Sequence, residues 1–172
     1  MFGRKKTLLV GGAGFIGRNL WSKWSVPERT VFDLSFGQDV LDGIEGKWDT
    51  IVFLAVDMGR TARALAYNKE LYRALDDYMY KYPDTHVIYT SSAAVYGDSN
   101  EPRTERSLTG PVNLYGQSKL LGEAYVQQYQ RHTILRLSNV HDRGAGHGVW
   151  DSFVNGNRRI HGDGSQVRDY IA

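Results

Sequence analysis

Short apolar runs alternate with longer stretches of helical periodicity along this 172-residue chain. The apolar runs, which predict strands, cover residues 7–11, 30–33, 50–56, 86–92 and 133–137. Helical patterns lie between several of them, at residues 15–24, 61–82 and 115–131. The run at 50–56 is almost wholly apolar, which is typical of a parallel strand covered on both faces. The alternation predicts an α/β fold, a doubly wound parallel sheet with helices on both faces.

Residues 11–17 read Gly-Gly-Ala-Gly-Phe-Ile-Gly and stand where the first strand gives way to a helix. This is the phosphate-binding position of a Rossmann-type fold, where glycine lets the backbone approach a pyrophosphate and the helix N-terminus attracts its charge. A tight turn needed only for packing is the alternative. Asp33 ends the second strand, where a carboxylate can bind a ribose diol and repel a 2′-phosphate. Together the two features predict a dinucleotide site that prefers NAD over NADP.

Tyr115 and Lys119 are four residues apart in the third helical stretch, so both lie on one face of that helix. Tyrosine has a pKa of about 10, and work as a base near pH 7 requires a decrease of roughly 3 units, or about 4 kcal/mol. The Lys119 ammonium would supply part of this, and an oxidised nicotinamide ring more. Ser92 ends the strand at 86–92, at the carboxyl end of the sheet, where such folds bind ligands. A solvated Tyr–Lys pair and a strand-end cap are the alternatives.

Composition narrows the class of protein. The chain has the length of one domain, and 41% hydrophobic with 23% charged residues is ordinary for a soluble globular protein. A net charge of +2 gives no electrostatic case for nucleic acid or a membrane surface as partner, and no apolar run is long enough to span a membrane. The absence of cysteine excludes disulfides and thiolate chemistry and fits a cytoplasmic protein. His141, His147 and His161 lack the spacing of a helical metal pair, so we expect no metal.

Several motifs carry a family resemblance over about residues 6–172. They are GGAGFIG, VFLA at 52–55, YTSSAAVYG, YGQSK, LRLSNV and GDGSQVRDYI, in that order. The chain resembles the extended short-chain dehydrogenase/reductases and, more narrowly, the NAD-dependent epimerase/dehydratase family that acts on nucleotide sugars. The resemblance implies NAD as cofactor and a nucleotide sugar as substrate.

The resemblance also implies a role for individual residues. The cofactor contacts that it implies are Gly11, Gly14, Phe15, Ile16, Gly17, Asp33, Asp39, Val40, Leu54, Ala55, Asn68 and Lys119. Among these, the three glycines match the pyrophosphate loop, Asp33 the adenosine ribose contact and Asp39 with Val40 the adenine contact. Leu54 and Ala55 match the strand end beneath the cofactor, Asn68 falls near the family's helix asparagine, and Lys119 holds the nicotinamide ribose.

For the reaction, the resemblance implies Ser92, Tyr115 and Lys119 as the catalytic residues, with Tyr115 as the base. The substrate contacts that it implies are Ser92, Ala93, Asn139 and Arg168. Only 16 residues separate Asp33 from the strand at 50, so the helix usual there would be reduced or lost. The family's substrate domain continues well beyond the RDYI segment. We therefore expect an NAD-binding domain at 1–138 and a partial substrate-binding segment at 139–172, truncated or reduced.

The residues after Ser92 narrow the reaction. Dehydratases of this family have Asp-Glu directly after the serine or threonine, and these side chains transfer protons. This chain has Ala93 and Ala94 there, which cannot transfer protons. The Ala-Ala pair resembles the 4-epimerases of the family. We therefore expect an NAD-dependent nucleotide-sugar epimerase. A reductase using NAD(P)H and a non-catalytic dinucleotide-binding protein stay open as alternatives. Relatives often dimerise through helices equivalent to 61–82 and 115–131, which makes a homodimer an option, although packing on the sheet explains the apolar positions of these helices equally well.

Overall fold

The computed structural model describes residues 5–23, 28–32, 46–99, 101–140, 156 and 170–171, with the backbone alone for 28–32 and 170. Contacts along the chain divide it into two units, Met1–Arg136 and Leu137–Ala172. Within the second unit, strands β6 (Asn139–Val140) and β7 (Tyr170–Ile171) pair in parallel. The first unit carries the sheet and the helices described below.

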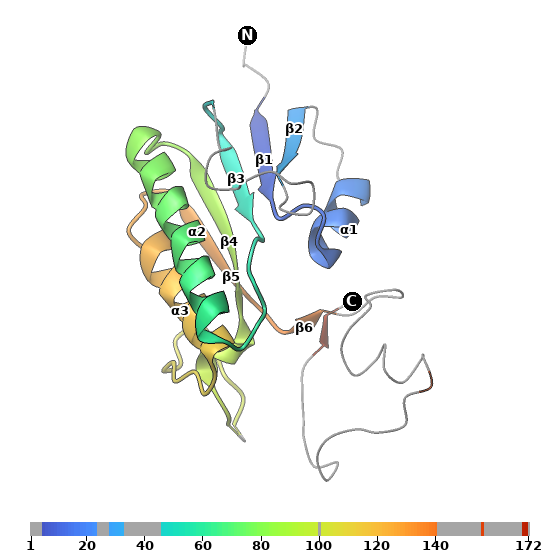
Figure 1. Ribbon diagram of the computed structural model, residues 1–172, viewed down its shortest axis with the longest axis vertical. Helices are drawn as coiled ribbons and strands as arrows, with labels where there is room; N and C mark the ends of the chain where they lie inside the picture. Colours follow the sequence, from blue (N-terminus) through green and yellow to red (C-terminus); the bar gives the residue numbers. More distant parts are fainter. Residues whose placement is uncertain are drawn as a thin grey trace. The chain divides into compact units, whose positions relative to one another are not determined.

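The first unit is built on a sheet whose strand order is β2-β1-β3-β4-β5 (Figure 1). Its strands are β1 (Lys6–Val10), β2 (Glu28–Phe32), β3 (Thr50–Phe53), β4 (His86–Ser92) and β5 (His132–Leu137). β1 pairs in parallel with both β2 and β3, and β3 pairs in parallel with β4. The order therefore reverses between β1 and β3. In doubly wound sheets, ligands bind beyond the carboxyl ends of the strands at such a switch point.

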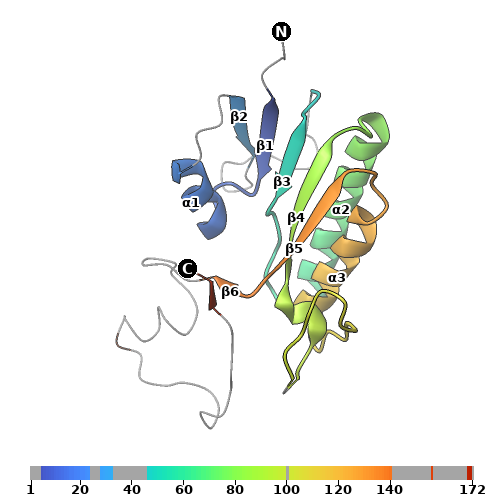
Figure 2. The same ribbon diagram turned by 180° about the vertical axis from the view of Figure 1, so that it is seen from behind.

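Helices lie on both sides of this sheet, as the alternation of patterns predicts. Figures 1 and 2 show α2 (Ala62–Lys81) and α3 (Leu114–Val126) side by side on one face and α1 (Phe15–Lys23) on the other. α2 begins where the Thr61 hydroxyl accepts a hydrogen bond from the Ala64 N–H, and it ends before Pro83. Among the described residues, no helix combines the length and the apolar character needed to cross a bilayer.

The core lies between α2 and the three central strands. Its largest fully buried apolar side chains are Leu8, Val10, Ile51, Phe53, Leu71, Tyr72, Leu75, Val87 and Tyr89. The rings of Tyr72 and Tyr89 meet edge to face, and their hydroxyl oxygens are 3.0 Å apart. The apolar face of α2 is thus buried against the sheet. The homodimer that the family resemblance implies stays a prediction.

Some elements end earlier than the sequence pattern predicts. β3 stops at Phe53 rather than at residue 56, because the chain then turns toward α2, where the Asn68 side chain bonds both backbone groups of Asp57. α3 stops at Val126 rather than at residue 131, because tighter i→i+3 bonds close a turn after it, such as Tyr129 N–H to Val126 C=O. The 3-10 turn η2 (Ala93–Tyr96) and the β6–β7 pair were not predicted. The helix expected to be reduced or lost before residue 50 falls mostly in 33–45, outside the described residues.

Candidate active site

The glycine loop joins the end of β1 to the start of α1, at the switch point of the sheet. Gly11 has φ +87°, and a Cβ there would lie 2.7 Å from the Ala55 nitrogen. A Cβ on Gly17 would lie 2.5 Å from the Gly12 Cα, because α1 packs directly on the loop. Gly14 differs, since its Cβ would meet only the Gly11 oxygen at 3.3 Å and the residue is exposed. Packing therefore demands two of the three glycines, and the third leaves open backbone beside the helix N-terminus.

The other residues with implied cofactor contacts lie around this loop or outside the described part of the chain. Leu54 donates its N–H to the Val10 carbonyl at 2.8 Å, and Ala55 packs against Gly11, so the end of β3 lies beside the loop. Phe15 and Ile16 form the first turn of α1 and are partly buried. Asp33, Asp39 and Val40 lie outside the described residues. The adenine and adenosine-ribose contacts therefore stay predictions.

Asn68 is buried in α2 and its side-chain amide is engaged with the protein. The amide oxygen accepts from the Asp57 N–H at 2.7 Å, and the NH₂ group donates to the Asp57 carbonyl and to the Ser118 hydroxyl, both at 2.9 Å. Asn68 thus clamps the loop after β3 to α3. This gives Asn68 a structural role beside the cofactor contact implied for it, and that contact stays a prediction.

Ser92 and Tyr115 meet at the carboxyl end of β4. The Ser92 hydroxyl accepts a hydrogen bond from the Ala94 N–H at 3.2 Å, which caps η2. Burial raises the pKa of Tyr115, and the nearby Ser92 side chain lowers it by less. A hydroxyl that accepts from Ala94 is left to donate toward the phenol oxygen. The structure therefore brings together the serine and tyrosine that the sequence singles out.

Lys119 is buried one turn along α3 from Tyr115. Its ammonium group donates to the Thr90 carbonyl at 2.7 Å and lies 5.1 Å from the centre of the Tyr89 ring. Burial lowers the pKa of Lys119 to about 7, because a low-polarity surrounding disfavours the charged form. The amine can therefore change its charge near neutral pH. Its contact with a nicotinamide ribose stays a prediction.

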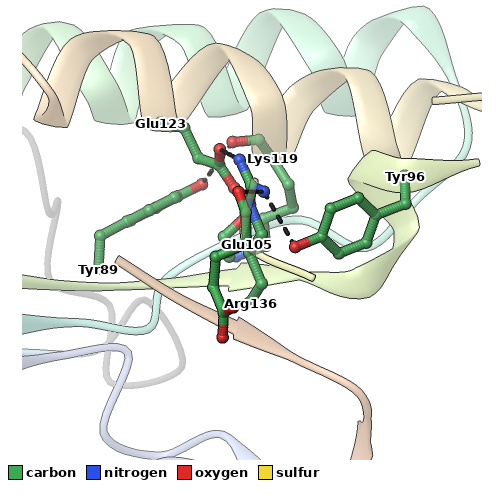
Figure 3. Close-up of polar contacts among 7 residues, drawn as sticks. Tyr89, Tyr96, Glu105, Lys119, Glu123 and Arg136 are labelled. Carbon is green, nitrogen blue, oxygen red and sulfur yellow. Dashed lines mark hydrogen bonds and ion pairs between the residues drawn. The ribbon is translucent and has the colours of Figure 1, made fainter. Parts of the chain in front are cut away.

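The ion pair between Glu123 and Arg136, which lies next to these residues, was not identified from the sequence (Figure 3). The Glu123 carboxylate accepts from the Arg136 guanidinium at 2.9 and 2.7 Å and from the Ser91 hydroxyl at 2.5 Å. Arg136 also donates to the Tyr96 hydroxyl at 3.0 Å and to the Glu105 carbonyl at 3.2 Å. One sequence signal pointed to it: Glu123 is four residues beyond Lys119, on the helix face that already carries Tyr115.

The residues with implied substrate contacts lie in different parts of the chain. Ala93 is exposed and opens η2, directly after Ser92. Asn139 belongs to the second unit, where it is exposed and faces Tyr170 across the β6–β7 pair. Arg168 and the three histidines at 141, 147 and 161 lie outside the described residues. Among the described residues, no group of three or more His, Asp or Glu side chains is arranged to hold a metal.

Comparison with known proteins adds a family match and several relatives. Residues 38–172 match the model of the NAD dependent epimerase/dehydratase family, a range that begins after the glycine loop and includes Ser92, Tyr115 and Lys119. A putative UDP-glucose 4-epimerase of Methanocaldococcus jannaschii is 37% identical over 109 residues, 54% of this chain and 36% of that protein. The N-acetyl-alpha-D-glucosaminyl-diphospho-ditrans,octacis-undecaprenol 4-epimerase of Escherichia coli O157:H7 is 30% identical over 141 residues, 71% of this chain and 43% of that protein. The chain thus spans less than half the length of either relative.

A solved structure supports both the fold and the cofactor. A short-chain dehydrogenase/reductase superfamily protein from Agrobacterium tumefaciens with bound NAD matches with a TM-score of 0.66 and 28% identity, over 80% of this chain and 50% of that one. The predicted family, the predicted Rossmann-type parallel sheet and NAD as the cofactor are confirmed. With 38–172 of its 172 residues matched, the chain belongs to the NAD dependent epimerase/dehydratase family, a family of enzymes whose cofactor is NAD.

Proposed function

We propose that this chain carries the NAD-binding and proton-transfer part of a nucleotide-sugar 4-epimerase. The observation that carries the proposal is that Ser92, at the carboxyl end of β4, lies beside Tyr115 and lowers its pKa, with Lys119 buried one turn further along α3. Two of the relatives described above are named as 4-epimerases, which supports the same reaction class. The second unit, which holds Asn139 and Arg168, would contact the diphosphate of the substrate.

The glycine loop fits a dinucleotide. Because packing requires Gly11 and Gly17 but not the exposed Gly14, open backbone remains at the start of α1, where a pyrophosphate would bind. Leu54 and Ala55 would lie beneath the cofactor at the end of β3. When bound, NAD supplies the hydride acceptor and donor for inversion at the sugar carbon.

The chain's own residues handle the proton. Tyr115 would take the proton of the sugar hydroxyl as that carbon is oxidised and return it on reduction, so that the enzyme ends each cycle unchanged. The Ser92 hydroxyl, held by the Ala94 N–H, would bond the same sugar oxygen and the phenol. A positive charge on the Lys119 amine would oppose the effect of burial, which raises the pKa of Tyr115.

The residues after Ser92 favour epimerisation over dehydration. Elimination of water requires an acid and a base beside the reacting carbons, and the two side chains that begin η2, Ala93 and Ala94, are methyl groups. A homodimer, a nucleotide sugar as substrate and the roles of Asn139 and Arg168 belong to the same proposal.

Proton NMR with a panel of UDP-, dTDP- and GDP-sugars tests the function. We expect a new anomeric signal from one sugar in the presence of catalytic NAD, without accumulation of NADH. Tyr115→Phe should abolish this signal while it leaves NAD binding intact, as measured by calorimetry. Stoichiometric consumption of NADH or NADPH would instead identify a reductase. NAD binding with no turnover of any sugar, and no role for Tyr115, would favour a non-catalytic dinucleotide-binding protein.

A further inference from the structure

Four consecutive residues at the end of β4 contact three α3 residues spaced by four. The Tyr89 hydroxyl donates to the Lys119 carbonyl at 3.3 Å, and the Thr90 carbonyl accepts from the Lys119 side chain. Ser91 then bonds Glu123, and Ser92 lies beside Tyr115 and lowers its pKa. Tyr115, Lys119 and Glu123 form one row along the helix. The position of Ser92 relative to Tyr115 is therefore set by contacts further along the same row.

Glu123 is the most constrained member of this row. Its side chain is 1% exposed, and its two carboxylate oxygens accept three hydrogen bonds, from the Ser91 hydroxyl and from two nitrogens of Arg136. Paired, two-point contacts of this kind fix direction as well as distance. Because Ser91 directly precedes Ser92, a shift of the Glu123 carboxylate would move the strand end that carries the Ser92 hydroxyl.

Arg136 extends the same restraint to the chain after η2. One of its terminal nitrogens donates to the Tyr96 hydroxyl and to the Glu105 carbonyl, so the guanidinium joins β5, α3, η2 and the segment that leads to α3 (Figure 3). The hydrogen bonds to Glu123, and to a smaller extent the one to Tyr96, raise the pKa of Arg136 and keep it charged. One cation thus anchors two segments that lie between Ser92 and Tyr115 in the sequence and the part of α3 beyond Tyr115.

Stability alone is a weak reason for such a pair. Apolar residues of similar size often stabilise a core as well or better, since removing two charges from water offsets much of their attraction. Positioning of a neighbouring group is a better account here, because the further hydrogen bonds of the pair go to Ser91, Tyr96 and Glu105, on the segments that flank Ser92 and lead to α3.

We propose that Glu123 and Arg136 are positioning residues, which act through Ser91 to set the contact between Ser92 and Tyr115. This inference rests on the proposed function only in taking Ser92 and Tyr115 as the working pair.

Carbon-13 NMR of the chain labelled at the tyrosine Cζ tests the proposal without turnover. The Tyr115→Phe variant lacks one Cζ signal, which identifies that signal as the one from Tyr115. The Ser92→Ala variant then shows by how much the Tyr115 pKa increases when the serine contact is lost. We expect Ser91→Ala and Glu123→Gln to raise the Tyr115 pKa by at least half of that increase. Glu70→Gln is the matched control, because it breaks an exposed ion pair with Arg73 at 2.8 Å and should leave the Tyr115 pKa unchanged. An unchanged Tyr115 pKa in Ser91→Ala would overturn the proposal.

A double variant separates positioning from stability. Glu123→Leu combined with Arg136→Met removes both charges together, so it should unfold at nearly the wild-type urea concentration even if Glu123→Gln alone does not fold. We expect the Tyr115 pKa of the double variant to be above that of the wild type, by about as much as in Ser91→Ala. Recovery of both the stability and the wild-type Tyr115 pKa would assign the pair a structural role and overturn the proposal.

Turnover adds an independent readout. In an active protein, Ser91→Ala should lower kcat about tenfold or more while KM changes less than about twofold, because misplacement of a catalytic group affects the chemical step. A chain that turns over no sugar would contradict the proposed function, yet the Tyr115 pKa would still decide whether Glu123 and Arg136 position the pair.

Discussion

At the scale of single residues, the three glycines of the loop make different demands. The Cβ of alanine at position 17 would meet the Gly12 backbone at 2.5 Å, whereas at position 14 it would meet the Gly11 oxygen at 3.3 Å. We expect Gly17→Ala to destabilise the fold by about 3 kcal/mol through overpacking. Gly14→Ala should cost about 1 kcal/mol at most but weaken NAD binding about tenfold, because the methyl group stands where the pyrophosphate would approach.

Urea unfolding and calorimetric titration with NAD measure both effects, and each variant is the other's control. A Gly14→Ala protein that binds NAD as tightly as wild type would show that the loop serves packing alone. The same loop would then be the tight turn that the sequence left open as an alternative.

The buried Lys119 amine links stability to pH. Burial lowers its pKa to about 7, while the unfolded chain keeps the ordinary value of about 10.4. Between these values the unfolded state binds a proton that the folded state does not, so the free energy of unfolding should rise with pH from about 7 to about 10, by at most about 1.4 kcal/mol per unit. Urea unfolding at several pH values measures this slope.

Lys119→Met should flatten the rise, and the exposed Lys69→Met should keep it. An equal slope in Lys119→Met and wild type would mean that another group is responsible. The region above pH 10 is excluded from the comparison, because burial raises the pKa values of Tyr72, Tyr89 and Tyr115 and these phenols reverse the direction of the dependence there.

At the scale of elements, α2 connects the loop after β3 to α3 through one side chain. Asn68→Ala removes three hydrogen bonds and takes its amide partner from the buried Ser118 hydroxyl, so we expect a loss of about 3 kcal/mol in the free energy of unfolding. NAD affinity should fall with it, because the loosened loop includes Ala55, which packs against Gly11.

Thr61→Ala is the control at the start of the same helix, since it removes the N-cap bond to Ala64 at a cost of about 1 kcal/mol and leaves the bonds between Asn68 and Asp57 in place. Urea unfolding and NAD titration of both variants separate the effects. Weaker NAD binding by an Asn68→Ala protein of wild-type stability would favour the direct cofactor contact implied by the family over the clamp.

The contrast between these elements explains what the sequence could predict. β4 was predicted with both its ends, and the roles assigned to Ser92 and Tyr115 come from patterns only a few residues long. Glu123 and Arg136 are 13 positions apart, and Asn68 and Ser118 are 50 apart, so only the folded chain brings them together. The end of β3 was missed for the same reason, since the Asn68 side chain holds the loop that follows it.

At the scale of the whole molecule, a division of labour between the two units is suggested: the first unit would bind the cofactor and the second the diphosphate of the substrate. The first unit, Met1–Arg136, holds the glycine loop, Ser92, Tyr115 and Lys119, all on one parallel sheet or the helices that cover it. The second unit, Leu137–Ala172, holds Asn139 and Arg168, which the family resemblance links to the substrate diphosphate. If the proposed function holds, binding of the cofactor and binding of the substrate's diphosphate should respond to changes in different units.

Asn139→Ala tests this separation directly. Asn139 is exposed in β6, and the loss of a hydrogen bond to an anionic diphosphate should weaken binding of UDP or the matching nucleotide about tenfold. NAD affinity should not change. Gly14→Ala provides the reverse comparison, with weakened NAD binding and unaltered nucleotide affinity. Calorimetry with each ligand measures all four values, and a loss of NAD affinity in Asn139→Ala would mean that the second unit contributes to the cofactor site, so that the division of labour is wrong.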